Sequence, residues 1–298
     1  MLLDELNNTY GIDNQLTFSK EKHMIIANIE SEYASAKLSL YGAQVLSFTP
    51  KEERNLIFLS KEAFYQNGKA IRGGIPICWP WFGAHPENKD LPSHGFARLS
   101  NWEVIQTSSS KGEIQIKLQL KNSKATEVLW PYKFETQVSL TIGKSLKIKL
   151  TTVNKDDKAF TITGALHSYL NISDSEKVKV EGLENIQYRD DVLHVKSLQK
   201  ESLLSIKGQV DRQYFDTSKT CIVHDPDYKR KIQIDKEGSQ ITVIWNPGDE
   251  LAAKMTDLGN KEYQNMLCVE AANNMNDAIT IKPNESHSLA TQISMILD

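Results

Sequence analysis

Three segments near the middle of the chain alternate strictly between apolar and polar residues. They are residues 113–120 (EIQIKLQL), 136–142 (TQVSLTI) and 145–150 (SLKIKL), and the last two flank Gly143-Lys144. Successive side chains of a strand point to opposite faces, so a period of two predicts strands that bury one face of a sheet. Gly143-Lys144 predicts a tight hairpin turn, which would make two of these strands antiparallel neighbours.

The remaining sequence also favours strands over helices. Helix signals are restricted to residues 61–66 and 249–256, the second following Pro247-Gly248. A parallel nucleotide-binding sheet is disfavoured, because regular βα alternation and the motifs GxGxxG and GxxxxGKS are absent. We therefore predict an all-β protein, one large, mostly antiparallel β-sandwich with a few short helices, forming a single domain over residues 1–298. Shorter strands are expected at residues 23–29, 35–41, 43–48, 55–59, 102–107, 159–166, 177–180, 241–245 and 288–296.

Composition and charge exclude several classes of function. The net charge is −3, which gives no general attraction for nucleic acid or an acidic membrane surface. The N-terminus carries Asp4 and Glu5 without the apolar run of a signal peptide, and no run reaches the roughly 18 apolar residues of a membrane span. Cys78, Cys221 and Cys268 are odd in number and far apart. We therefore expect reduced thiols in a cytoplasmic protein, without disulfides or a zinc site.

Residues 71–98 (IRGGIPICWPWFGAHPENKDLPSHGFAR) are the least regular part of the sequence. Four glycines and four prolines exclude a long helix or a central strand across most of this segment. Its aromatic residues supply apolar surface that disordered segments lack. Long irregular segments inside compact domains usually carry function when they are ordered. We therefore predict an ordered loop lining a site, with Arg72 and Arg98 at its two ends; a purely structural crossover is the alternative.

Two titratable residues stand in apolar, strand-like surroundings. His167 ends the run TITGALH, and Glu270 lies between MLCV and AANN. A buried charge is costly unless it is paired or used, and burial would raise the pKa of Glu270 toward that of a general base. The alternatives are a His167 ring bonded to the backbone at a strand end, and a Glu270 on the solvent face of an edge strand. His94, between Ser93 and Gly95, is a third candidate.

A metal site is not expected from the sequence. His85, Glu87, Asp90 and His94 lie close together in the chain, but their spacing matches no zinc or EF-hand pattern. His85 fits a solvated loop residue equally well.

Several motifs together resemble one enzyme family. RGGIPICWPWFG, LPSHGFAR, ALHSYL, VDRQY and CVEAAN follow one another in the order found in the glucose-6-phosphate 1-epimerase (hexose-6-phosphate mutarotase) family. That family is a branch of the aldose 1-epimerase, or galactose mutarotase-like, superfamily. The resemblance covers nearly the whole chain. It implies a large β-sandwich with an open groove on one sheet, and interconversion of the α and β anomers of a hexose 6-phosphate without an organic cofactor.

The resemblance also implies roles for particular residues. The family's catalytic histidine falls on His167 and its catalytic carboxylate on Glu270. Its substrate-binding arginines fall on Arg72 and Arg98, and its binding aspartate on Asp211. In the implied reaction the carboxylate removes the proton of the C1 hydroxyl while the imidazolium protonates the ring oxygen, and the roles reverse on closure. The arginines would hold the 6-phosphate, because the guanidinium fork matches phosphate oxygens.

One position departs from the family pattern. Many members resemble LPQHGFAR, whereas this chain has Ser93 before His94. A serine hydroxyl has a shorter reach than a glutamine amide, so either a water fills the gap or the sugar specificity differs. His94 matches a histidine that the wider superfamily places near the sugar ring, and we include both residues among the substrate-binding candidates.

Other functions remain open from the sequence. One is a mutarotase of unphosphorylated sugars, and another is a sugar-phosphate sensor that has lost catalysis. The sequence does not distinguish glucose, galactose and mannose 6-phosphate. The expected partner is a small-molecule substrate, with no nucleic acid or membrane, and the expected state is a monomer. A sugar face would stack on one of four aromatic residues unless they pack in the core, namely Trp79, Trp81, Phe82 and Trp245.

Overall fold

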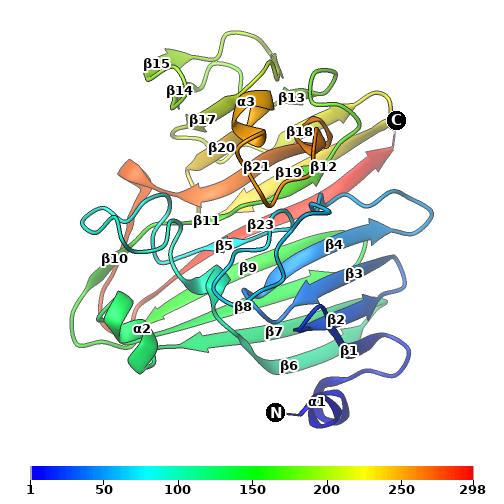
Figure 1. The fold of residues 1–298 in the computed structure, drawn as a ribbon, viewed down its shortest axis with the longest axis vertical. Coiled ribbons are helices and arrows are strands. Elements are labelled where there is room, and N and C mark those ends of the chain that lie inside the picture. Colours follow the sequence, from blue (N-terminus) through cyan, green and yellow to red (C-terminus); the bar gives the residue numbers. More distant parts are fainter. Residues whose placement is uncertain (1, 298) are drawn as a thin grey trace.

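The fold is built from two large antiparallel sheets, one of nine strands and one of eight. A computed structural model describes residues 2–297 and shows these sheets with the smaller elements arranged around them (Figure 1). Every pairing between named strands in the described residues is antiparallel. The prediction of a large, mostly antiparallel β-sandwich is therefore confirmed.

The nine-stranded sheet contains the three alternating segments as neighbours. They form β7 (Glu113–Lys121), β8 (Phe134–Ile142) and β9 (Ser145–Asn154), whose apolar positions are buried in the main core. Ile142 pairs with Leu146, so the hairpin turn at Gly143-Lys144 is confirmed. The other strands of this sheet are β6 (Glu103–Ser110), β13 (Lys179–Glu181), β16 (Leu203–Ser205), β18 (Cys221–Asp225), β19 (Arg230–Glu237) and β23 (Ser286–Leu297).

The central strand β21 of the eight-stranded sheet is buried on both faces, which have different neighbours. On β21 (Met266–Asn273), Leu267, Val269 and Ala271 join the main core between the sheets. The alternate residues of β21 point to the other face, because side chains alternate along a strand. The remaining strands of this sheet are β5 (Ile77–Cys78), β11 (Gly164–Leu166), β12 (Tyr169–Asn171), β14 (Gln187–Asp190), β15 (Val195–Leu198), β17 (Val210–Tyr214) and β20 (Ile241–Asn246).

Smaller elements complete the fold. The prediction of a helix at 249–256 is confirmed in its first part by α3 (Gly248–Ala252). None of the described helices is long and apolar enough to cross a membrane. A four-stranded sheet comprises β1 (Leu16–Glu21), β2 (Met24–Glu30), β3 (Ala34–Ser39) and β4 (Gln44–Pro50), and β10 (Phe160–Ile162) pairs with β22 (Ile279–Ile281). The other helices are α1 (Leu3–Tyr10), α2 (Lys124–Leu129) and the short 3₁₀ turns η1 (Ala97–Leu99), η2 (Glu262–Asn265) and η3 (Met275–Asp277).

Three local predictions were wrong. Residues 61–66 form no helix, because the preceding chain is held extended: Leu59 bridges Gly73, and the Ser60 N–H donates to the Arg72 carbonyl. Residues 55–59 make only isolated bridges rather than a strand. Residues 159–166 form two strands instead of one, since β10 and β11 pair within different sheets.

Candidate active site

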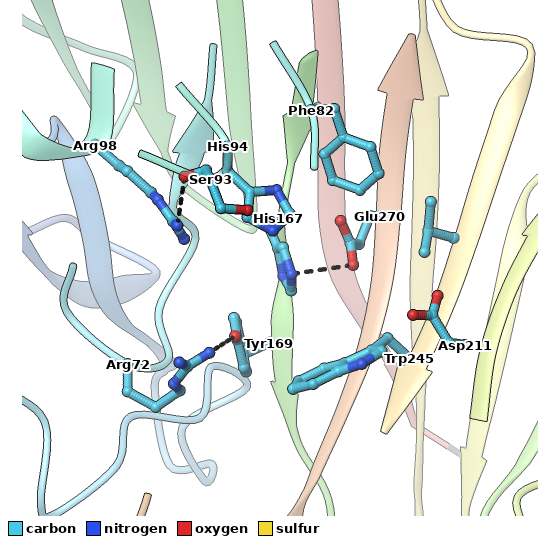
Figure 2. Close-up of a pocket in the computed structure, with 11 residues that line it drawn as sticks. Arg72, Phe82, Ser93, His94, Arg98, His167, Tyr169, Asp211, Trp245 and Glu270 are labelled. Carbon is cyan, nitrogen blue, oxygen red and sulfur yellow. Dashed lines mark hydrogen bonds and ion pairs between the residues drawn. The ribbon is translucent and has the colours of Figure 1, made fainter. Parts of the chain in front are cut away.

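A cavity of about 330 Å³ opens where the irregular segment 71–98 meets the outer face of the eight-stranded sheet. This volume lies at the lower end of the range for small-molecule sites. All seven site residues expected from the sequence line the cavity (Figure 2). The complete lining is Arg72, Phe82, Ser93, His94, Arg98, His167, Tyr169, Asp211, Val243, Trp245 and Glu270.

Strand register brings the sheet residues of the cavity together. Asp211 on β17 pairs with Trp245 on β20, and Val243 on β20 pairs with Glu270 on β21. Directly paired residues of antiparallel strands share a face, so these side chains project together into the cavity. His167 follows β11 and faces Glu270, because the pairs that flank it are Leu166 with Ala271 and Tyr169 with Cys268.

His167 and Glu270 form a buried pair at the centre of the cavity. The His167 Nε2 atom lies 3.3 Å from Glu270 Oε1, and the two residues are 8% and 2% exposed. The alternative of a solvent-facing Glu270 on an edge strand is therefore excluded. Neither His167 Nδ1 nor Glu270 Oε2 has a hydrogen-bond partner among the described residues. Both atoms are therefore buried polar groups without a partner in the described part of the chain, and such exceptions often mark functional positions.

Burial sets the protonation of this pair. Desolvation raises the pKa of Glu270 well above its ordinary value, and the nearby Asp211 charge adds to the rise. Desolvation lowers the pKa of His167 well below its ordinary value, with His94 and Arg98 adding to the fall. Both shifts favour a protonated, neutral carboxyl and a neutral imidazole. A neutral carboxyl beside a neutral imidazole contains as many protons as a carboxylate beside an imidazolium. Transfer of one proton from Glu270 to His167 therefore converts the first state into the second.

His94 reaches the cavity through strained backbone. Its φ is 63°, and the next residue, Gly95, has a φ of 71° and approaches the Trp79 carbonyl so closely that a Cβ would collide with it. Gly95 is therefore required for the close approach. The His94 Nδ1 accepts the Gly83 N–H at 3.2 Å, which leaves the proton of a neutral ring on Nε2. Desolvation, with the Arg98 charge, lowers the pKa of His94 to about 3.

Arg72 is already ordered by two partners. Its Nε donates to Asp257 Oδ2 at 3.2 Å, and its Nη1 donates to the Tyr169 hydroxyl at 2.9 Å. The Tyr169 ring in turn stacks on the His167 imidazole, with centroids 4.8 Å apart and planes inclined by 14°. Tyr169 therefore contacts both an arginine at one side of the cavity and the central histidine.

Arg98 keeps more of its donors free. It lies in η1, and its Nη2 donates to the Ser93 carbonyl at 2.9 Å, while its buried Nε has no partner in the described part of the chain. Figure 2 shows Arg72 and Arg98 on one side of His167, with Asp211 and Trp245 on the other. Cations thus gather at one side of the cavity, and polar and aromatic groups gather at the other.

Asp211 lies among other acids. Desolvation raises its pKa to about 6, and the charge of Asp191 contributes. The neighbouring residue Arg212 is bonded to Asp190 instead, with its Nε 2.9 Å from the carboxylate. Asp211 is therefore free to accept hydrogen bonds from a ligand.

The aromatic candidates divide between core and cavity. Trp79 and Trp81 are buried in the main core, whereas Phe82 and Trp245 line the cavity. The sequence motifs indicate no role for Tyr169 or Asp257. Tyr169 could have been found, since it stands two residues from His167 and shares its face in an extended chain. Asp257 gave no signal, because it is 185 positions from Arg72 and meets it only in the folded protein.

The metal-like cluster noted in the sequence does not have converging donors. His85 Nδ1 instead accepts the backbone N–H groups of Glu87 and Asn88. Within the described residues, the donor atoms that do converge belong to His167, Cys268 and Glu270.

Comparison with known proteins agrees with the fold and the motifs. The sequence matches the aldose 1-epimerase family over residues 26–294. It is 35% identical over 260 residues to a protein of Cenchrus ciliaris, covering 84% of this chain and 78% of that protein. It is 32% identical over 243 residues to a protein of Salmonella typhimurium, covering 81% of each. Both relatives carry the name "Putative glucose-6-phosphate 1-epimerase".

Solved structures show the same architecture. The crystal structure of the Salmonella typhimurium mutarotase-type protein YeaD superimposes with a TM-score of 0.91 at 28% identity, covering 97% of this chain and 96% of that one. A galactose mutarotase-like protein from Lactobacillus casei shares the fold at 15% identity, with a TM-score of 0.72 and coverage of 91% and 100%. The chain belongs to the aldose 1-epimerase family.

Proposed function

We propose that this protein is a hexose-6-phosphate mutarotase, an isomerase that interconverts the α and β anomers of glucose 6-phosphate and related sugars. The observation that carries the proposal is the meeting of a buried His167–Glu270 pair and two arginines in one cavity. The names of the two relatives, glucose-6-phosphate 1-epimerase in each case, support the same substrate.

The pair supplies the proton transfers of mutarotation. The Glu270 carboxylate takes the proton of the C1 hydroxyl while the His167 imidazolium donates a proton to the ring oxygen, and the C1–O5 bond breaks. Rotation about C1–C2 presents the other face of the aldehyde, and the reverse transfers close the ring. The pair starts and ends with one proton, so the cycle needs no net exchange with solvent. Burial favours the state in which both groups are neutral. Transfer of one proton from Glu270 to His167 over the 3.3 Å contact converts this state into the reactive carboxylate and imidazolium.

Arg72 and Arg98 provide the site for the 6-phosphate. Two guanidinium groups offer planar donor forks to phosphate oxygens. Asp257 offsets part of the charge of Arg72, whereas the Nε of Arg98 has no partner among the described residues. The phosphate would thus bind to both arginines while the ring lies between His167 and Asp211. His94 and Ser93, at the same rim, would contact ring hydroxyls.

We also propose that the chain works as a monomer in the cytoplasm, as a single domain over residues 1–298. Cys78, Cys221 and Cys268 are free and buried, which suits a reducing compartment. Phosphorylated sugars are charged and remain inside cells, so the proposed substrate favours the same location.

Exchange NMR of α and β glucose 6-phosphate tests the proposal. We expect wild-type protein to accelerate exchange, and Glu270→Gln and His167→Ala each to lower kcat by roughly 10²- to 10⁴-fold, the contribution of one acid–base group. Full activity of both variants would contradict the mechanism. Inactive but sugar-phosphate-binding wild type would favour a sensor.

The arginine variants test the phosphate assignment in the same experiment. Arg72→Ala and Arg98→Ala should reduce exchange of glucose 6-phosphate and leave that of glucose much less affected. Arg54→Ala is the matched control, because Arg54 packs on Tyr228 outside the cavity. Equal loss on both sugars would point instead to a mutarotase of unphosphorylated sugars.

A further inference from the structure

A third metal-type donor lies beside the catalytic pair. The donor atoms of His167, Cys268 and Glu270 all lie within 4.8 Å of one another. Cys268 stands two residues before Glu270 on β21, so both side chains occupy the cavity-side face of the strand. Its paired residues, Tyr169 and Trp245, both line the cavity. The thiol has no role in the proton transfers.

The three donors suit one kind of ion. A thiolate and an imidazole select zinc-like cations over magnesium or calcium, which prefer oxygen. In tetrahedral zinc sites, with bonds of 2.0–2.3 Å, donor atoms are separated by roughly 3.5 Å. His167 Nε2 and Glu270 Oε1 are already 3.3 Å apart, and all three donor atoms lie within 4.8 Å of one another, so a movement of roughly 1 Å at most would bring the three donors to the spacing of a zinc site.

Two further observations favour a site for an ion. Glu270 Oε2 and His167 Nδ1 are buried without partners in the described structure, so the carboxylate can turn toward an ion without breaking a hydrogen bond. The three side chains are also nearly inaccessible, with Cys268 0% exposed. Cys268 does not line the cavity and lies in an apolar cluster, so a cation would reach its sulfur from the cavity past His167 and Glu270, which do line it.

We propose that His167, Cys268 and Glu270 form an inhibitory Zn²⁺ site within the active site. On binding, the Cys268 S–H bond and the Glu270 O–H bond are replaced by bonds to zinc, and both protons leave to solvent. The imidazole and carboxylate lone pairs become metal ligands, so neither group can accept or donate a proton to the sugar. The inhibition rests on the proposed mutarotase function, whereas the binding itself does not.

Calorimetric titration with ZnCl₂ of protein freed of metal by chelation tests the binding. We expect one equivalent to bind to the wild type, and Cys268→Ser to weaken binding by roughly 100-fold, since loss of even an outer partner of a metal ligand costs 10–100-fold. Cys221→Ser is the matched control, because it removes a buried thiol on β18 in the other large sheet. It should bind zinc as the wild type does.

Two further readouts separate the possible outcomes. Cd²⁺ should give ultraviolet thiolate-to-metal absorption in the wild type and Cys221→Ser, but not in Cys268→Ser or in Cys268→Ala, a second variant in case the serine fails to fold. Zn²⁺ should slow anomer exchange in parallel with its binding. Absent binding, or binding that survives Cys268→Ser, would overturn the site, and binding without inhibition would overturn its inhibitory role. Wild type inactive without metal would contradict the mutarotase function, while the titration would still report on the site.

Discussion

Tyr169 contacts both the proposed phosphate-binding side of the cavity and the proposed catalytic pair. Its hydroxyl accepts a hydrogen bond from Arg72, and its ring stacks on His167. The residue thus orients the proposed phosphate-binding arginine and the proposed acid at the same time. Burial raises the pKa of the hydroxyl above its ordinary value, which already exceeds the physiological range, so the side chain stays neutral in this role.

The two contacts of Tyr169 can be separated by substitution. Tyr169→Phe removes the hydroxyl and keeps the ring, so we expect KM for glucose 6-phosphate to rise about tenfold with kcat nearly unchanged, the cost of one hydrogen bond to a charged group. Tyr169→Leu also removes the stacking and should lower kcat. Steady-state exchange NMR over a range of substrate concentrations measures both constants. Equal losses of kcat in the two variants would show that the hydroxyl itself takes part in the chemistry.

Individual site residues differed in how far the sequence could reveal them. His167 and Glu270 could be recognised because a titratable group in an apolar strand is costly unless it is paired or used. The family motifs then indicated their roles. Asp257 could not be found, because an exposed-looking acid in a turn has no local signature and its partner lies far away in the sequence. The contacts of single residues with distant partners are properties of the fold, not of the local pattern.

Among the elements, β7 shows most clearly how alternation in the sequence determines which residues contribute to the free energy of unfolding. Its residue Ile116 is fully buried between β6 and β8, whereas its neighbour Gln115 is exposed. Ile116→Ala should lower the free energy of unfolding by about 2–5 kcal/mol, through lost burial and the cavity left behind. Gln115→Ala should change it by less than about 0.5 kcal/mol. Urea unfolding followed by circular dichroism distinguishes them, and similar midpoints would contradict the assigned faces.

Strands could be predicted from the sequence where one face of the strand is buried and the other is exposed to solvent. The strands β7, β8 and β9 meet that condition, and so their alternation was visible. The edge strand β15 is exposed at all of its positions, so it has no such alternation to detect. The helix expected at residues 61–66 does not form for another reason. The hydrogen bond from the Ser60 N–H to the Arg72 carbonyl holds the preceding chain extended, and this tertiary contact overrides the local helix preference.

At the scale of the whole molecule, the buried histidines tie stability to pH. The pKa of His94 is lowered to about 3, so the unfolded chain binds more protons than the folded one between about pH 3 and 6.5. Stability should therefore fall as pH drops through this window, by up to about 1.4 kcal/mol per pH unit for one group. Asp211 acts in the opposite sense, because its pKa is raised to about 6 and the folded state binds more protons between about pH 3.8 and 6.

Two variants should therefore change this pH dependence in opposite directions. Between pH 4 and 6, His94→Gln should flatten the rise of stability with pH, and Asp211→Asn should steepen it. Urea unfolding at several pH values measures both slopes. Parallel changes in the two variants would contradict the assigned protonation states.

The pairing of β21 with the chain from β11 to β12 has a consequence for how activity is gained during folding. His167 and Glu270 are 103 positions apart and meet only because Leu166 pairs with Ala271 and Tyr169 with Cys268. A slip of one residue would turn the Glu270 side chain into the core. A compact but misregistered sheet would thus retain strands and lack any turnover. Anomer exchange therefore reports the correct register of the central strands, a property that strand content measured by spectroscopy does not resolve.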